Sequence, residues 1–244
     1  IRERLDKLFD KGTFDEDHLW SHPIKTGFDI DERELPGDAV VIGIGKIHGR
    51  PVCVYGHDFT ILGGTFGAAL HHKVNRAMGM ARERGIPCIG VIDSGGERIH
   101  TQFAIGGEAL ASGLYFVPSI NSGVIPQITV MLGPSYAGSA YSPTMADFYI
   151  MRNKIAFMSV ASPALLKSVT YADVTQEELG GAELHATTTG NADFLTESDE
   201  EALEICRELV RYLPLNNRES PPIIDTGDDP SRRDDRLIEI VPAD

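Results

Sequence analysis

Short hydrophobic runs alternate with glycine-rich turns and polar segments along most of the chain. The run at residues 89–92 (IGVI) is rich in β-branched residues, is too short for a typical helix and lies between Pro87 and Gly95. Gly95 and Gly96 then lead into a charged segment with helical content. The pattern predicts a strand, a tight turn and a helix at this point.

The same order of strand, glycine-rich turn and helix recurs at intervals of roughly thirty to forty residues. Such units are typical of an α/β fold, in which the turns gather along one edge of the sheet, where ligands usually bind. The expected strands are residues 39–47, 51–55, 89–92, 124–132 and 151–160. The expected helices are residues 2–9, 68–84, 97–116, 162–169 and 198–213, with a further helix that follows a turn at residues 133–140 and ends at Ala146.

Two segments lack this pattern. Residues 13–37 are polar and charged, which predicts a surface connection. Residues 216–244 combine prolines with a run of charges and contain few aromatic residues, which is typical of an extended linker. We therefore expect one domain over residues 1–215, followed by an acidic linker over residues 216–244.

Gly95 and Gly96 are the first candidates for a role in chemistry. Adjacent glycines let the backbone approach a ligand closely, and their amides at a helix start form a donor pair for a developing negative oxygen. Glycine pairs also occur at strand-to-helix turns for packing reasons alone. The pair by itself leaves both interpretations open.

The net charge of −14 and the pI of ≈ 4.9 restrict the partners. Nucleic acids and anionic membranes bind basic surfaces, so we expect neither as a partner. An anionic ligand needs a local basic patch, for which Arg98 has the best position and Lys73 and Arg76 are weaker candidates.

The cysteines and the apolar runs indicate a compartment. Cys53, Cys88 and Cys206 are odd in number and far apart, which indicates reduced thiols inside a cell. The first residues are charged, and no apolar run is long enough to span a bilayer. The expected localisation is the cytoplasm, or the mitochondrial matrix of a eukaryote.

Three histidines could suggest a metal site. His71 and His72 diverge because they are adjacent on an expected helix, and no cysteine or acidic set completes a ligand pattern with His100. No metal is expected.

Ser135 suggests a second enzyme class. Residues 133–137 (GPSYA) resemble the nucleophile elbow of α/β-hydrolases, and Asp173 and His185 follow in the order of that family. The fifth position of the elbow is Ala137 instead of glycine, and a proline precedes the serine, which argues against hydrolysis.

Several separated motifs occur along the chain in a fixed order. They are residues 63–67 (GGTFG), 93–99 (DSGGERI), 122–127 (SGVIPQ), 133–134 (GP), 141–143 (YSP) and 174–182 (VTQEELGGA). Together they resemble the carboxyltransferase (β) subunit of biotin-dependent acyl-CoA carboxylases over about residues 2–213. The resemblance implies a crotonase-like (ClpP/crotonase) ββα superhelix. It also implies the amino-terminal half of a subunit that continues into a second, homologous carboxyltransferase domain.

The resemblance implies that a carboxyl group moves from carboxybiotin to the α-carbon of an acyl-CoA. Gly95 and Gly96 match the positions expected to hold the enolate oxygen, and biotin itself accepts the proton, so no side-chain base is required. The residues expected to bind the substrate or cofactor are Gly63, Gly64, Gly67, Arg98, Ala137, Gly138, Gly180 and Gly181.

Partners are also implied. The chain contains neither a Met-Lys-Met biotinylation motif nor a Gly-Lys-Ser/Thr loop for ATP. The biotin carboxyl carrier and the biotin carboxylase would therefore be separate subunits, joined to a homo-oligomer that is a hexamer in the family. An acyl-CoA decarboxylase of the same fold and an inactive CoA-binding assembly domain remain alternatives.

The chain departs from the family pattern at a few positions. Glu97 stands where family members often have alanine, and Ser135, Tyr136 and Ser139 stand in a segment that is usually rich in cysteine, glycine and alanine. Glu97 either changes the acyl preference or is a solvated acid at a helix start. Tyr136 either narrows the acyl or biotin pocket or packs against its neighbours.

Overall fold

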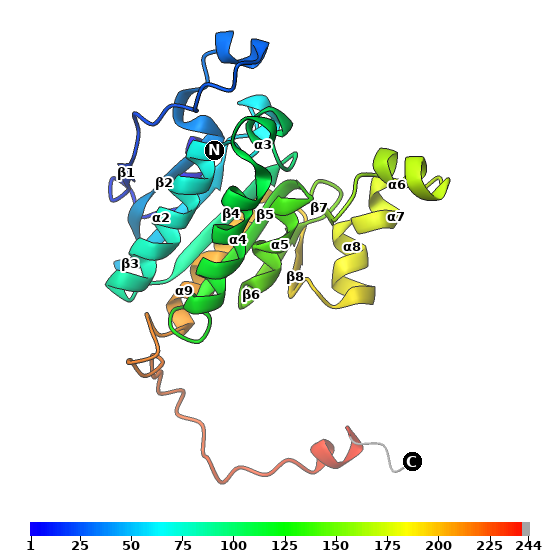
Figure 1. The fold of residues 1–244 in the computed structure, drawn as a ribbon. Coiled ribbons are helices and arrows are strands. Elements are labelled where there is room, and N and C mark those ends of the chain that lie inside the picture. Colours follow the sequence, from blue (N-terminus) through cyan, green and yellow to red (C-terminus); the bar gives the residue numbers. More distant parts are fainter. Residues whose placement is uncertain (241–244) are drawn as a thin grey trace.

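A mixed eight-stranded sheet with helices on both faces forms the centre of the computed structural model (Figure 1). The structure describes residues 1–240, and the side chains of all of these except residues 107–113. The strands are β1 (Asp15–Asp17), β2 (Val40–Ile47), β3 (Arg50–His57), β4 (Cys88–Ser94), β5 (Gln127–Tyr136), β6 (Phe148–Arg152), β7 (Phe157–Ser159) and β8 (Phe194–Thr196). The helices are α1 (Arg2–Leu8), α2 (Ala68–Arg84), α3 (Ile99–Ile105), α4 (Gly107–Asn121), α5 (Gly138–Tyr141), α6 (Pro163–Thr170), α7 (Gln176–Gly180), α8 (Ala182–Leu184) and α9 (Asp199–Tyr212).

The sheet order is β1-β2-β3-β4-β5-β6-β8, and β7 pairs with the end of β5. The first three strands are antiparallel, and β3 to β8 are parallel. The hairpin between β2 and β3 turns at His48 and Gly49, which have positive φ angles of 51° and 75°. The parallel strands place their carboxyl ends on one edge, where the loops to the helices begin. The predicted α/β fold is confirmed.

A hydrophobic layer covers each face of the sheet, because successive side chains along a strand point to opposite faces. Along β3, Val52 and Val54 pack with α1 and α9, whereas Cys53 and Tyr55 face α2. Helices α2 and α4 cover one face of the sheet, and helices α1 and α9 cover the other (Figure 1).

A buried ion pair holds the start of β2 against the loop after β4. Asp38 is fully buried, and Arg98, which is 4% exposed, donates to it. The second oxygen of Asp38 accepts from the backbone amide of Leu70, 3.0 Å away, in the first turn of α2. Gly67 leaves space for the pair, because a β-carbon there would lie 2.3 Å from the Arg98 guanidinium. One carboxylate therefore fixes three segments.

Most of the predicted elements are confirmed, among them the helices at residues 2–9, 68–84, 162–169 and 198–213 and the first three strands. The predicted turn at residues 133–140 is wrong over its first half, because β5 continues to Tyr136. The single strand expected at residues 151–160 is also wrong: β6 ends at Arg152, and β7 begins at Phe157. The polar segment 13–37 contains the unpredicted strand β1.

The chain beyond α9 leaves the body after two anchors. The Asn216 side chain donates to the carbonyl of Gly85, and the backbone amide of Asn217 donates to the carbonyl of Val124. From there the backbone is extended and leads away from the sheet, apart from one turn of 3₁₀ helix (Figure 1). The last residues, 241–244, belong to the predicted linker but lie outside the described residues.

Removal of the Asp38 carboxylate should destabilise the whole domain. Asp38→Ala leaves the Arg98 charge buried without its partner, and we expect a loss of about 3–5 kcal/mol in the free energy of unfolding. The exposed Lys167–Asp173 pair provides the control, since Asp173→Ala should cause no measurable change. Urea unfolding of both variants measures the difference, and equal effects would contradict the role of the buried pair.

His57 should make the stability depend on pH. Burial and the nearby His71 lower the pKa of His57 from 6.5 to about 3, so the ring is neutral in the folded chain. The unfolded chain binds a proton below about pH 6.5, so stability is complete above that pH and is lost as pH falls towards about 3, by up to about 1.4 kcal/mol per pH unit. His57→Gln removes this titration, and its unfolding free energy should fall less than that of the parent between pH 7 and pH 5. Equal changes in the unfolding free energy of the parent and of His57→Gln between pH 7 and pH 5 would show that His57 does not titrate in this way.

Candidate active site

Two glycine-rich loops lie side by side at the carboxyl edge of the sheet. Residues 62–67 follow β3, and residues 95–98 follow β4. The backbone amide of Phe66 donates to the carbonyl of Gly96, 2.9 Å away. Gly64 has a φ of 64°, and a β-carbon there would lie 2.2 Å from a backbone oxygen of β4. The structure therefore brings the predicted glycines of both loops together, as the repeated β/α pattern indicated.

The amides of Gly95 and Gly96 are already used within this arrangement. The amide of Gly95 donates to the carbonyl of Gly63, 2.8 Å away, and the amide of Gly96 donates to the hydroxyl oxygen of Ser94, 3.1 Å away. The first bond joins the two loops, and the second lies within the loop after β4. Neither N–H group is free for a ligand oxygen in this structure, and the donor role of Gly95 and Gly96 stays a prediction.

A different pair of amides is free at the end of β5. The chain turns sharply at Ala137, whose φ of 52° and ψ of −127° are rare for a residue with a side chain. Over the part of the chain that the structure describes, the amides of Gly138 and Ser139 have no hydrogen-bond acceptor. Adjacent free amides at a sharp strand-to-helix turn are suited to an oxygen that gains negative charge. Sequence reasoning named Ala137 and Gly138 as binding residues but missed the Ser139 amide, for which the run of small residues after β5 was the signal.

The hydrolase arrangement is not assembled. Ser135 lies inside β5, is fully buried and donates to the carbonyl of Ser139, 2.8 Å away. Asp173 is exposed and pairs with a lysine, and the His185 ring contacts the carbonyl of Met158 at 3.0 Å. The sharp turn comes two residues after the serine, so Ser135 is not at the position of a nucleophile.

The side chain of Glu97 extends from the loop after β4 towards the turn after β5. Its oxygen Oε2 accepts from Nε2 of His71, 3.1 Å away, and its side chain is 14% exposed. A β-carbon on Gly138 would lie 2.2 Å from the other oxygen, Oε1. The expectation of a solvated acid at a helix start is therefore wrong.

Arg98 has a structural role in this region. Besides Asp38, its guanidinium donates to the carbonyl of Thr65, 2.8 Å away. The charge of Arg98 is paired and buried, and its contact with a phosphate stays a prediction. Lys73 is likewise buried, with Nζ 3.0 Å from the carbonyl of Gly37, and burial lowers its pKa.

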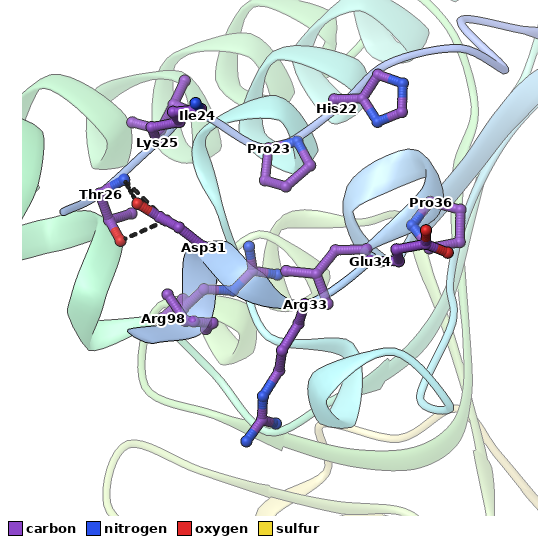
Figure 2. Close-up of a pocket in the computed structure, with 12 residues that line it drawn as sticks. His22, Pro23, Ile24, Lys25, Thr26, Asp31, Arg33, Glu34, Pro36 and Arg98 are labelled. Atoms are coloured by element: carbon purple, nitrogen blue, oxygen red, sulfur yellow. Dashed lines mark hydrogen bonds between the residues drawn. The ribbon is translucent and has the colours of Figure 1, made fainter. Parts of the chain in front are cut away.

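Arg98 also lies at the base of a cavity of ≈ 430 Å³ (Figure 2). The segment 22–36, which precedes β2, forms most of the wall. Lys25 and Arg33 belong to this wall, and neither forms an ion pair with any residue that the structure describes. These two cations were missed by sequence reasoning, although they are basic residues within a mainly acidic segment.

Gly180 and Gly181 serve close packing beside β7. A β-carbon on Gly180 would lie 2.1 Å from the carbonyl oxygen of Met158, and the amide of Gly181 donates to the carbonyl of Glu177. Nearby, the Tyr136 hydroxyl accepts a hydrogen bond of 2.6 Å from the side chain of Gln176, the first residue of α7. Tyr136 thus packs against α7.

Among the described residues, no group of three or more histidine, cysteine, aspartate or glutamate side chains is arranged to hold a metal ion. No helix in residues 1–240 combines the length and the apolar character needed to cross a bilayer.

Comparison with known proteins places this site in a family. The family model of the carboxyl transferase domain matches residues 1–244. The carboxyltransferase subunit of propionyl-CoA carboxylase from Haloferax mediterranei is 42% identical over 243 residues, which are 99% of this chain and 46% of that protein. Methylmalonyl-CoA decarboxylase subunit alpha from Veillonella parvula is 41% identical over 99% of this chain and 47% of its own length.

Solved structures agree with these relatives. The hexameric core of transcarboxylase 12S, determined with hydrolysed methylmalonyl-CoA bound, superposes with a TM-score of 0.91 at 40% identity. It covers 100% of this chain, and this chain covers 47% of it. The beta subunit of geranyl-CoA carboxylase from P. aeruginosa has a TM-score of 0.74 at 32% identity, over 87% of this chain and 39% of that subunit. The expected crotonase-like fold is confirmed.

The chain spans about half the length of the curated relatives that it matches. Both the sequence match and the superposition extend over nearly all of its residues. The chain therefore belongs to the carboxyl transferase domain family.

Proposed function

We propose that the chain is the amino-terminal carboxyltransferase domain of a biotin-dependent acyl-CoA carboxylase. The observation that carries this proposal is the free amide pair of Gly138 and Ser139 at the carboxyl edge of the sheet. Membership of the carboxyl transferase family supports the same reaction class.

The amide pair would stabilise the enolate of the acyl-CoA. Loss of a proton from the α-carbon moves negative charge onto the thioester oxygen, and donors that are already oriented towards this oxygen lower the barrier. One such donor contributes about 3–4 kcal/mol in other enzymes. Carboxybiotin, carried by a partner protein, is the proposed carboxyl donor.

The CoA part would lie towards the cavity beside Arg98. Lys25 and Arg33 line this cavity, and both charges are available for phosphate groups. Arg98 would hold the wall of this cavity in place through its hydrogen bond to Asp38. The glycines at 63, 64 and 67 would shape the path between the cavity and the turn.

The proposed assembly contains more than this chain. Residues 216–244 would connect residues 1–215 to a second carboxyltransferase domain, since the matched relatives are about twice as long. The proposed partners are a biotin carboxyl carrier, a biotin carboxylase and further copies of the subunit in a hexamer, as in transcarboxylase 12S. We place this assembly in the cytoplasm or, in a eukaryote, in the mitochondrial matrix, like the mitochondrial relatives from pig and human.

Decarboxylation is the second candidate function. The relative from Veillonella parvula is a methylmalonyl-CoA decarboxylase subunit at 41% identity. The same amides would hold the enolate formed when carbon dioxide leaves. Turnover that requires bicarbonate and ATP in the assembled enzyme would favour carboxylation, whereas net loss of the acyl carboxylate would favour the decarboxylase.

Ligand binding tests the amide pair without changing the protein. Calorimetric titration should show that propionyl-CoA binds about tenfold more tightly than S-propyl-CoA, a thioether of the same length that lacks the thioester oxygen, because each of the two hydrogen bonds to the neutral thioester oxygen contributes about 0.5–1.5 kcal/mol. Free CoA should bind about as well as the thioether.

Ser139→Pro removes one amide hydrogen and should reduce the preference for the thioester. Ser135→Ala provides the control, since the Ser135 hydroxyl contacts the carbonyl and the hydroxyl of Ser139, at 2.8 Å and 3.2 Å, and neither of the two amides. Equal affinity for propionyl-CoA and S-propyl-CoA in the parent chain would refute the assignment of the donors.

A further inference from the structure

The turn after β5 holds an alanine in a backbone conformation that strongly favours glycine. The φ of 52° and ψ of −127° at Ala137 are close to the angles of the first central residue of a type II′ turn. A residue with a side chain is strained at such angles and keeps them only where the surrounding contacts impose them. The contacts around this turn therefore decide whether the next two amides keep their direction.

The hydroxyl of Ser139 provides one of these contacts. Ser139 is fully buried, and its hydroxyl donates to the carbonyl of Tyr136, 2.7 Å away. The amide of Ala137 belongs to the same peptide group and donates to the carbonyl of Ser159, 3.3 Å away. This planar group is thus held at both ends. Rotation of the group, which would relieve the strain by moving Ala137 to a negative φ, breaks both bonds.

The carbonyl of Tyr136 is also closely packed against the loop after β4. A β-carbon on Gly96 would lie 2.8 Å from this carbonyl oxygen, so the glycine leaves the space that the carbonyl occupies. A carbonyl that turns away from water needs a donor from the protein. The Ser139 hydroxyl is such a donor.

This use of the hydroxyl leaves the Ser139 amide available. In a type II′ turn, the carbonyl of the first residue often accepts from the amide of the fourth residue, which here is Ser139. The hydroxyl forms that bond instead, and the amide has no acceptor among the described residues. The following peptide group is fixed by the amide of Ala140, which donates to the carbonyl of Ala137, 3.0 Å away. Both free amides are therefore oriented before any ligand binds.

Two other hydrogen bonds near the turn do not hold this peptide group. The hydroxyl of Ser135 donates to the carbonyl of Ser139, which follows the amide pair. The bond between Gln176 and the phenol of Tyr136 is exposed, where water competes for both partners.

We propose that Ser139 is a positioning residue whose hydroxyl holds the strained turn at Ala137 and so directs the amides of Gly138 and Ser139 at the thioester oxygen. The inference rests on the proposed function, which assigns this oxygen to the two amides. Without the hydroxyl, the turn relaxes towards a negative φ at Ala137. The two amides then lose their common direction.

Calorimetric titration of Ser139→Ala with propionyl-CoA and S-propyl-CoA tests this role. The variant removes the hydroxyl and keeps both amide hydrogens. The roughly tenfold preference of the parent for the thioester should fall to about threefold or less, because hydrogen bonds to the thioester oxygen are lost. A general loss of structure would weaken both ligands alike, so the ratio of the two affinities is the readout. Ser139→Cys, in which a weak thiol donor replaces the hydroxyl and leaves no void, should show the same fall.

Ala137→Gly, introduced into Ser139→Ala, should restore the preference. Glycine adopts a positive φ without strain, so the turn no longer depends on the hydroxyl, and the preference should return to within about twofold of the parent value. A change that acted only through lost packing at Ser139 would not be reversed in this way.

Ser168→Ala is the matched control. The hydroxyl of Ser168 also donates to the carbonyl three residues before it, that of Leu165, 2.7 Å away, but it lies on α6 and is exposed. The preference of Ser168→Ala for the thioester should equal that of the parent. Thermal unfolding shows that each variant is folded.

The outcomes separate this inference from the proposed function. A preference that persists in folded Ser139→Ala, or a loss that Ala137→Gly does not restore, would overturn the role of the hydroxyl and leave the assignment of the amides in place. Absence of a preference in the parent would overturn both. An equal loss in Ser168→Ala would also count against Ser139, because the effect would then not depend on position.

Discussion

The buried ion pair between Arg98 and Asp38 is the constraint on which the site depends. A charge inside a protein costs several kcal/mol unless a partner and further hydrogen bonds compensate for it. Asp38 precedes β2, Arg98 follows β4, and the amide of Leu70 at the start of α2 completes the group. These segments are far apart in the sequence, so the pair is satisfied only when the loops after β3 and β4 are brought together. In this arrangement the two glycine-rich loops lie close enough to form backbone hydrogen bonds with each other.

Much of the fold could be predicted because its signals are local. The helix Ala68–Arg84 ends at Gly85, whose positive φ of 63° is the usual helix stop. The long β5 could not be predicted, because Gly133 followed by proline is typical of a turn. The structure supplies another reason for this glycine: a β-carbon there would lie 1.9 Å from the Asp93 carboxylate, which extends across from β4 to reach Arg4. That requirement depends on the neighbouring strand and leaves no trace in the local sequence.

The candidate site shows the same limit. Its location at the glycine-rich edge followed from the repeated strand, turn and helix pattern. The pattern could not predict which amides are free, because an amide is free only where no other segment places a hydrogen-bond acceptor against it. The carbonyl of Gly63 occupies the amide of Gly95, whereas the sharp turn at Ala137 leaves the next two amides without an acceptor among the described residues. Arg98 likewise had the right position for a phosphate contact, yet a distant aspartate takes up its charge.

The two anchors of the tail have a consequence for access. Asn216 is bound to Gly85 and Asn217 to Val124, at the amino ends of β4 and β5. The candidate site lies at the carboxyl ends of the same strands. Whatever is attached through the tail is therefore tethered to the opposite rim of the sheet. A force applied to the tail therefore acts first on the rim of the sheet opposite the glycine loops.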